Sequence, residues 1–150
     1  MIDIKIKKLT DDAVLPTYGS SKAACMDLYA NCKEDVIIEP HTTEKIGTGI
    51  AMQPINFHEN GGYVGLIFAR SGMATKWGLR PANCVGVIDE DYTGEIIVAV
   101  HNDKDTPNVI RKGDRIAQMM WLPYCQCNLI EVNSLDETER GDGGFGHTGV

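Results

Sequence analysis

The sequence contains few aromatic residues and fewer basic than acidic ones. Phe, Trp and Tyr make up 7% of the 150 residues, and 14 Lys and Arg stand against 21 Asp and Glu, a net charge of −7. A net negative charge does not suit a protein that binds nucleic acid by neutralising the phosphates along a duplex. We therefore expect no nucleic-acid partner, and a bound phosphate would need arginines or a metal ion at one site.

Long apolar runs are also missing. No stretch approaches the roughly 20 apolar residues that a membrane-spanning helix needs, and the opening MIDIKIKK lacks the apolar segment of a secretion signal. The five cysteines are odd in number and include no CxxC pair, which disfavours a zinc site and fits a reducing compartment. We expect a cytoplasmic protein with no membrane partner.

Short strand patterns follow one another along most of the chain. A length of 150 residues gives room for one core, and only residues 74–78 indicate a helix, of one or two turns. We predict an all-β, jelly-roll-like sandwich or barrel with one short helix. The β-rich runs, separated by clusters of turn-forming residues, are 2–9, 36–38, 63–68, 84–88, 95–100, 114–122 and 127–132.

The C-terminal segment, SLDETERGDGGFGHTGV, differs in composition from the rest. It holds five of the 16 glycines and little that could pack in a core. We predict a β-rich core over residues 1–133 and a flexible, Gly-rich C-terminal arm over 134–150. Taken alone, such a segment fits either a disordered tail or a lid that wraps around phosphate, and its residues leave both open.

An acidic residue and an aromatic one lie close together between two strand patterns. Asp89 follows the run CVGVI, and Tyr92 comes three residues later, before EIIVAV, which predicts a tight hairpin with both side chains at its mouth. A carboxylate there can deprotonate a water, while the ring packs on a sugar or base. A solvated acidic turn is the alternative, because Asp is a common turn residue.

Two further places carry groups suited to an anion. Arg70, Ser71 and Gly72 follow a predicted buried strand and enter a turn, where a guanidinium, a hydroxyl and backbone N–H groups are available. Asp27 lies in the half-apolar run MDLYA, and a half-buried carboxylate needs a partner to stay charged. A structural salt bridge and a functional acid are both open for Asp27.

Taken in order, five segments resemble the five motifs of the trimeric deoxyuridine triphosphatase (dUTPase) family. The set is more specific than any one member and spans residues 24–149. The segments are ACMDLYA (24–30), ARSGMA (69–74), NCVGVIDEDYTGE (83–95), GDRIAQ (113–118) and RGDGGFGHTG (140–149).

The resemblance implies hydrolysis of dUTP to dUMP and pyrophosphate by water attack on the α-phosphorus, with Mg²⁺ bound across the triphosphate. Such an activity limits uracil incorporation into DNA and supplies dUMP for thymidylate synthesis. By match, Asp89 is the base that activates the water. Uracil is held by Asn83, Val87, Ile88 and Ile97, without space for a 5-methyl group, and Tyr92 lies under the deoxyribose, where it crowds a 2′-hydroxyl.

The remaining matches concern the phosphates and the arm. Arg70, Ser71, Gly72 and Gln118 match phosphate-contacting positions, with Ser71 also in the catalytic set, and Asp27 matches an acid that orders the water shell of the metal. Catalytic Arg140 arrives with the arm of another subunit, so the resemblance implies a homotrimer with shared active sites. The arm also brings the substrate-binding residues Phe145, which covers the uracil ring, Gly146, His147 and Thr148.

Two residues depart from the family pattern. Cys25 stands where the family usually has glycine, which costs roughly 1 kcal/mol if that backbone has positive φ. His147 stands where a serine normally contacts the terminal phosphates. These departures keep a second class of function open, a regulatory protein that uses nucleotide as a switch. A dCTP deaminase-like enzyme is the alternative within enzymes, because a related family with the same fold supports that reaction.

Overall fold

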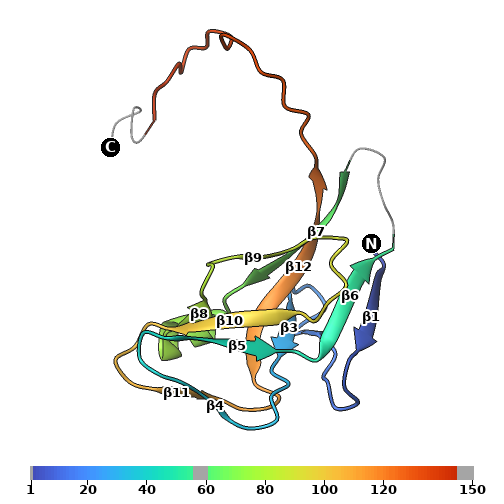
Figure 1. Ribbon diagram of the computed structural model, residues 1–150, viewed down its shortest axis with the longest axis vertical. Helices are drawn as coiled ribbons and strands as arrows, with labels where there is room; N and C mark the ends of the chain where they lie inside the picture. The colour runs from blue at the N-terminus through green and yellow to red at the C-terminus, as the bar shows by residue number, and fades with distance from the viewer. Residues whose placement is uncertain (1, 56–60, 145–150) are drawn as a thin grey trace.

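The computed structural model describes residues 2–55 and 61–144, and the regular elements there are strands, with one short helix (Figure 1). The elements, in order, are β1 (Ile4–Lys8), β2 (Thr17–Tyr18), β3 (Met26–Tyr29), β4 (Val36–Ile38), β5 (Thr43–Gly47), β6 (Ile50–Pro54), β7 (Gly61–Phe68), the helix η1 (Met73–Trp77), β8 (Leu79–Pro81), β9 (Gly86–Ile88), β10 (Ile97–Asn102), β11 (Asn108–Ile110) and β12 (Arg115–Cys125).

The strands form four small sheets whose neighbours are far apart in sequence. One sheet has the order β2-β3-β12-β7-β9 and a second has the order β5-β10-β8, while β1 pairs with β6 and β11 pairs with β4. The long β12 lies between β3 and β7 and pairs antiparallel with both. Crossovers of this kind are typical of a jelly roll, and the predicted fold class is confirmed.

The core lies between the five-stranded and three-stranded sheets. In β12, Met119 and Trp121 both point into the core and are 0% and 8% exposed. Ile67 of β7 is the strand partner of Met119. From the three-stranded sheet, Val98 and Val100 of β10 are buried in the same core. Each fully buried side chain of this size contributes about 1.5–3 kcal/mol, so these alternating positions hold the two sheets together.

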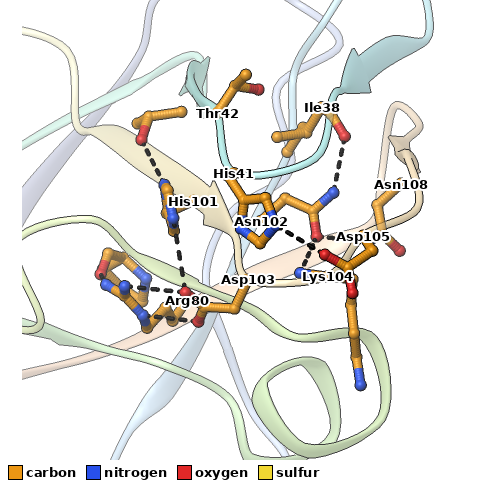
Figure 2. Close-up of polar contacts among 12 residues, drawn as sticks. Ile38, His41, Thr42, Arg80, His101, Asn102, Asp103, Lys104, Asp105 and Asn108 are labelled. Carbon is orange, nitrogen blue, oxygen red and sulfur yellow. Dashed lines mark hydrogen bonds and ion pairs between the residues drawn. The ribbon is translucent and has the colours of Figure 1, made fainter.

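A polar network closes one end of the three-stranded sheet (Figure 2). The Asn102 side chain is fully buried and donates to the Ile38 carbonyl at 3.0 Å. Beside it, Arg80 donates to both carboxylate oxygens of Asp103, at 2.8 and 3.0 Å, and the His101 Nε2 lies 3.5 Å from Asp103 Oδ1. These contacts tie β8 and β10 to the chain before β5.

The short helix predicted over 74–78 is confirmed as η1, and it fixes the turn after β7. The Ala74 N–H donates to the Arg70 carbonyl at 3.0 Å, and the Thr75 hydroxyl donates to the Ser71 carbonyl at 2.7 Å. The helix ends at Gly78, whose φ of 66° is left-handed and suits glycine. Arg70 and Ser71 are therefore held at the start of a helical turn.

Two predicted elements are wrong. Residues 127–132 form a β-rich run but no strand, and they are exposed, because the chain leaves the body after Cys125 and meets no sheet edge of its own (Figure 1). The predicted hairpin of residues 84–100 is also absent: β9 pairs with β7, while β10 pairs with β5 and β8. The segment between β9 and β10 instead crosses from one sheet to the other.

Candidate active site

The crossing segment between β9 and β10 encloses a hollow of about 180 Å³. Its walls bring together five residues predicted from the sequence and one that was missed, Glu95. The apolar residues of its walls are unusually exposed to solvent: Val87 is 59% exposed and Ile97 is 44% exposed. The lining residues are Val87, Ile88, Asp89, Tyr92, Glu95 and Ile97.

Tyr92 is fixed against the floor of this segment. Its hydroxyl donates to the Glu95 carbonyl at 2.9 Å, and its N–H donates to the Asp89 carbonyl at 3.2 Å. A Cβ added to Gly94 would lie 2.6 Å from the Tyr92 hydroxyl oxygen. The close contact with the Tyr92 ring therefore requires glycine at position 94. The two hydrogen bonds hold the Tyr92 ring in one orientation beside the hollow.

Asn83 lies outside the residues that line the hollow. It is exposed in the turn before β9, and its carbonyl accepts a hydrogen bond from the Val85 N–H at 2.7 Å. The next residue, Cys84, has a φ of 63°, an uncommon backbone conformation for a residue with a side chain. The sequence pattern carried no signal for this turn, since Cys is not a residue that favours it.

The carboxylates of the crossing segment form a negatively charged surface beside the end of β12. Burial, and then the nearby carboxylates of Glu90, Asp89 and Asp91, raise the pKa of Tyr124. Both causes disfavour a phenolate, so the Tyr124 hydroxyl keeps its proton near the hollow.

A second cluster surrounds Asp27. Asp27 is 9% exposed, and its Oδ1 accepts a hydrogen bond from Arg70 Nε at 2.7 Å. Its Oδ2 accepts one from Arg115 Nη1 at 3.2 Å, and Arg70 Nη1 also donates to the Arg115 carbonyl at 3.3 Å. The salt bridge considered for Asp27 is therefore present, and Arg115 is a partner that the sequence reasoning missed, although it lies in the fourth motif.

Three more predicted residues lie around this arginine cluster. Gln118 pairs with Asp27 across β3 and β12, and its Nε2 donates to the Ala69 carbonyl at 2.8 Å. Ser71 and Gly72 are exposed at the start of the helical turn, and a Cβ at Gly72 would meet nothing within 4 Å. Guanidinium, hydroxyl, amide and backbone N–H groups thus lie along one edge, which suits a polyanion.

The hollow and the arginine cluster lie beside different parts of β7. The crossing segment is attached at Tyr63, whose N–H donates to Glu90 Oε2 at 2.9 Å, while Gln118 pairs with Phe68. The β9 wall of the hollow lies nearer to Phe68 than this attachment does, since Ile88 pairs with Gly65 and Val87 with Leu66. The residues that line the hollow nevertheless include none of the cluster residues Arg70, Ser71 and Gln118.

The predicted arm residues are described only in part. The side chain of Arg140 is exposed, and its Nε donates to the Gly143 carbonyl at 2.9 Å, within the arm itself. The predicted contacts of Phe145, Gly146, His147 and Thr148 lie outside the described residues.

Cys25 does not carry the strain considered for it. Among residues 2–55 and 61–144, only His41 and Cys84 combine a side chain with positive φ. Burial, and then the Asp27 carboxylate, raise the pKa of the Cys25 thiol. The substitution therefore leaves the backbone before β3 in an ordinary conformation.

A metal centre made by this chain alone is not found in the part of the chain that the structure describes, since no three His, Cys, Asp or Glu side chains come together there. The Asp27 carboxylate nevertheless suits an outer contact to a hydrated cation. Each of its oxygens accepts one arginine hydrogen bond and has a second lone pair for water. No helix within the described residues is long and apolar enough to cross a membrane.

Comparison with known sequences gives one consistent family. Residues 11–149 match the dUTPase family model. The deoxyuridine 5'-triphosphate nucleotidohydrolase of Desulfitobacterium hafniense is 46% identical over 151 residues, 99% of this chain and 97% of the relative. The protein of the same name from Nautilia profundicola is 46% identical over 146 residues, 97% of this chain and 98% of the relative.

Solved structures agree with this result. The dUTPase of Staphylococcus bacteriophage 80alpha with dUPNHPP has a TM-score of 0.84 at 28% identity and covers 99% of both chains. A mutant dUTPase from phage phi11 of S. aureus, described with a structural Mg(II) ion, has a TM-score of 0.77 at 22% identity and covers 90% of this chain and 99% of its own. The second likeness supports the fold alone.

The fold and the two clusters define a jelly-roll protein with an apolar hollow beside a carboxylate and a separate edge for a polyanion. Among proteins of this kind, the chain belongs to the dUTPase family. The resemblance drawn from the five motifs is confirmed.

Proposed function

We infer that this protein hydrolyses dUTP to dUMP and pyrophosphate. The observation that carries the inference is the hollow of about 180 Å³, in which the exposed Asp89 carboxylate lies at the rim of an apolar wall formed by Val87, Ile88 and Ile97. Apolar side chains suit a flat uracil ring, and a carboxylate beside them suits a general base for water. The named relatives support the same activity.

Asp89 takes the proton from the attacking water as the new bond to the α-phosphorus forms, and pyrophosphate leaves. Tyr92 packs under the deoxyribose, where its fixed ring leaves little space for a 2′-hydroxyl. Asn83 adds a hydrogen bond to the uracil edge. The resemblance implies that the uracil site has no space for a 5-methyl group, so we expect thymine to be rejected by shape.

The triphosphate binds along the edge made by Arg70, Ser71, Gly72 and Gln118. The guanidinium of Arg70 is oriented by Asp27, and the hydroxyl and backbone N–H groups of the helical turn face solvent. Ser71 contacts the phosphate under attack. These groups offset charge that grows on the phosphates in the transition state.

Mg²⁺ supplies charge neutralisation across the triphosphate when it is bound. Asp27 would hold the hydrated ion through the lone pairs of its carboxylate that accept no arginine hydrogen bond. Arg70 stays in place through its own bond to Asp27, so the cation and the arginine do not compete for one position.

The complete site requires more than one chain, and we propose a homotrimer with shared active sites. The lining of the hollow supports this, because it includes none of the phosphate-edge residues Arg70, Ser71 and Gln118, which another chain would then supply. Closed ring symmetry then gives each hollow one cluster. The arm over 134–150 delivers Arg140, Phe145, Gly146, His147 and Thr148 to a neighbouring subunit.

The chain between β12 and Arg140 suits contact with a neighbour. Leu129, Ile130 and Leu135 are 90%, 76% and 88% exposed, an unusual state for apolar side chains in a folded protein. Within the described residues β1 pairs only with β6, so its other edge is open to a further strand.

We propose that the core and arm divide near residue 133. We also propose a cytoplasmic location, which the five unpaired cysteines support.

The other activities considered are not favoured. A dCTP deaminase would release ammonia from dCTP, yet the named relatives are dUTP nucleotidohydrolases. Control of virulence-gene transfer is described for the dUTPase of phage 80alpha, which is 28% identical to this chain. No described feature of this chain points to a regulatory partner.

The test is a pyrophosphate-release assay across dUTP, dTTP, dCTP and UTP, each with Mg²⁺ or with EDTA. We expect turnover of dUTP with Mg²⁺, and little turnover of the other three nucleotides. Asp89→Asn should lower kcat by about 10²–10⁴ and leave binding of a non-hydrolysable dUTP analogue largely intact. Comparable turnover by Asp89→Asn, or equal rates for all four nucleotides, would contradict the proposal.

A further inference from the structure

Two glutamates outside the predicted catalytic set hold the ends of the segment that carries Asp89. Glu90 follows Asp89 directly, and Glu95 lies two residues before β10. Each side chain accepts a hydrogen bond from the backbone of a different part of the fold. The two carboxylates therefore fasten the segment at both ends.

The Glu90 carboxylate lies against β7. Its Oε2 accepts the Tyr63 N–H at 2.9 Å in a part-buried position. A Cβ added to the neighbouring Gly62 would overlap this carboxylate. Gly62 pairs with Tyr124 in regular strand register and has no positive φ, so the backbone itself does not require glycine. The glycine leaves the space that the Glu90 carboxylate occupies.

Glu95 repeats the same arrangement on the other sheet. Its Oε1 accepts the Gly49 N–H at 2.8 Å, and a Cβ added to Gly47 would lie 2.5 Å from that oxygen. Gly47 is the last residue of β5. A glutamate carboxylate over a glycine, bonded to a backbone N–H, thus occurs once on each side of the hollow.

The segment lies between β9, which ends at Ile88, and β10, which begins at Ile97. Its β10 end is also held by Ile96, which is fully buried and donates its N–H to the Ile50 carbonyl at 2.9 Å. The Glu90 contact therefore matters most for the end that carries Asp89. Bonds from a backbone N–H to a carboxylate are stronger than neutral ones. In a catalytic site, a misplacement of about 1 Å can cost on the order of 10² in rate.

We propose that Glu90 and Glu95 are positioning residues, which clamp the Asp89 segment to the two sheets so that the hollow and its carboxylate are in place before nucleotide binds. The proposal rests on the proposed function, in which Asp89 is the base. Glu90 gives the sharper test, because its side chain does not line the hollow.

The experiment removes the Glu90 clamp from each of its two sides. Glu90→Ala deletes the carboxylate, and Gly62→Ala displaces it while Glu90 remains. We expect each change to lower kcat for dUTP about tenfold or more, with KM changed less than about threefold, because the base is misplaced. Combining the two should cost nothing further, because the added Cβ then has room and both changes remove one interaction.

Glu90→Gln is the conservative variant. Its amide oxygen can still accept the Tyr63 N–H, so kcat should stay within about threefold of the wild type. Gly19→Ala is the matched control, since a Cβ at Gly19 would meet nothing within 4 Å. Melting temperatures of all variants show whether each is folded at the assay temperature.

Each outcome supports or overturns the clamp. Additive losses in the double variant, unchanged kcat in both single variants, or a loss in Glu90→Gln as large as in Glu90→Ala would overturn it. If Glu90→Ala does not fold, Gly62→Ala and Glu90→Gln still decide the matter, because only the first should lose kcat. Wild type and Asp89→Asn run alongside: an inactive wild type or an active Asp89→Asn contradicts the proposed function, whereas normal clamp variants with an inactive Asp89→Asn contradict the clamp alone.

Discussion

Arg70 donates a hydrogen bond from Nε to Asp27 Oδ1 at 2.7 Å and so joins two motifs that lie 43 residues apart in the chain. Asp27 is 9% exposed and also receives Arg115, so one carboxylate orients two guanidinium groups at the end of the five-stranded sheet. This relationship explains how an acidic protein can present a locally positive edge to a polyanion.

Asp27→Asn should weaken both the fold and the phosphate edge. The neutral amide leaves two arginines without a counter-charge, and we expect a loss of about 1–3 kcal/mol in the free energy of unfolding, with a higher KM for dUTP. Urea unfolding and steady-state kinetics measure the two effects. Asp35→Asn is the control, because its pair with Arg111 is exposed and should contribute less than about 1 kcal/mol. Equal losses in the two variants would contradict the role of Asp27.

Gly94→Ala should loosen sugar discrimination. The new methyl group would displace the Tyr92 ring, whose hydroxyl oxygen lies 2.6 Å from the position of that Cβ. We expect kcat/KM for dUTP to fall by about 10–100-fold and the preference for dUTP over UTP to narrow. Rates with both nucleotides check this. A uniform loss for dUTP and UTP, with the preference unchanged, would show that Tyr92 does not set the sugar specificity.

Asp103 should contribute stability that acid removes. The hydrogen bond from Arg80 lowers the pKa of Asp103 below its ordinary value of 3.8. The folded state therefore favours the charged carboxylate, and this stabilisation is present above the ordinary value and is lost as pH falls through the lower folded value. Asp103→Asn should be less stable than the wild type at pH 6, with a gap that closes below pH 3.8. A gap that stays constant across this range would contradict the assignment.

Cys25 should react slowly with alkylating reagents. Burial raises the pKa of its thiol, and the nearby Asp27 carboxylate raises it further, so less thiolate is present at any given pH. Cys125 is exposed in the same chain and serves as an internal control. Timed iodoacetamide labelling at pH 8, followed by peptide mass spectrometry, should show Cys125 modified first. Faster labelling of Cys25 would contradict the expectation.

Much of the fold could be predicted from local patterns. Residues 36–38 form β4 as expected, and the runs at 63–68 and 114–122 correspond to β7 and β12. Those runs are rich in apolar, strand-forming residues and are bounded by turn residues. Residues 127–132 are rich in such residues too, yet they form no strand in a single chain. A β-rich composition shows that a segment suits a sheet, but it does not show whether a partner strand is present.

The hollow was predictable because its residues come from one continuous motif. Four of its lining residues, Val87, Ile88, Asp89 and Tyr92, lie within six positions of one another. Arg115 was missed because its contact with Asp27 crosses two strands and depends on register, which the sequence does not show. The clamp by Glu90 was missed for a similar reason: a glutamate in a turn looks solvated until the facing strand is known.

A mixing experiment tests the shared site most directly. Asp89→Asn lacks the base, and Arg70→Ala lacks the phosphate edge, so each should be nearly inactive alone. If the hollow of one chain works with the arginine cluster of another, refolding equal amounts together should restore about a quarter of wild-type activity, since random assembly gives that share of sites two intact parts. If both parts of a site belong to one chain, the mixture would stay as inactive as its components, and the shared site would be contradicted.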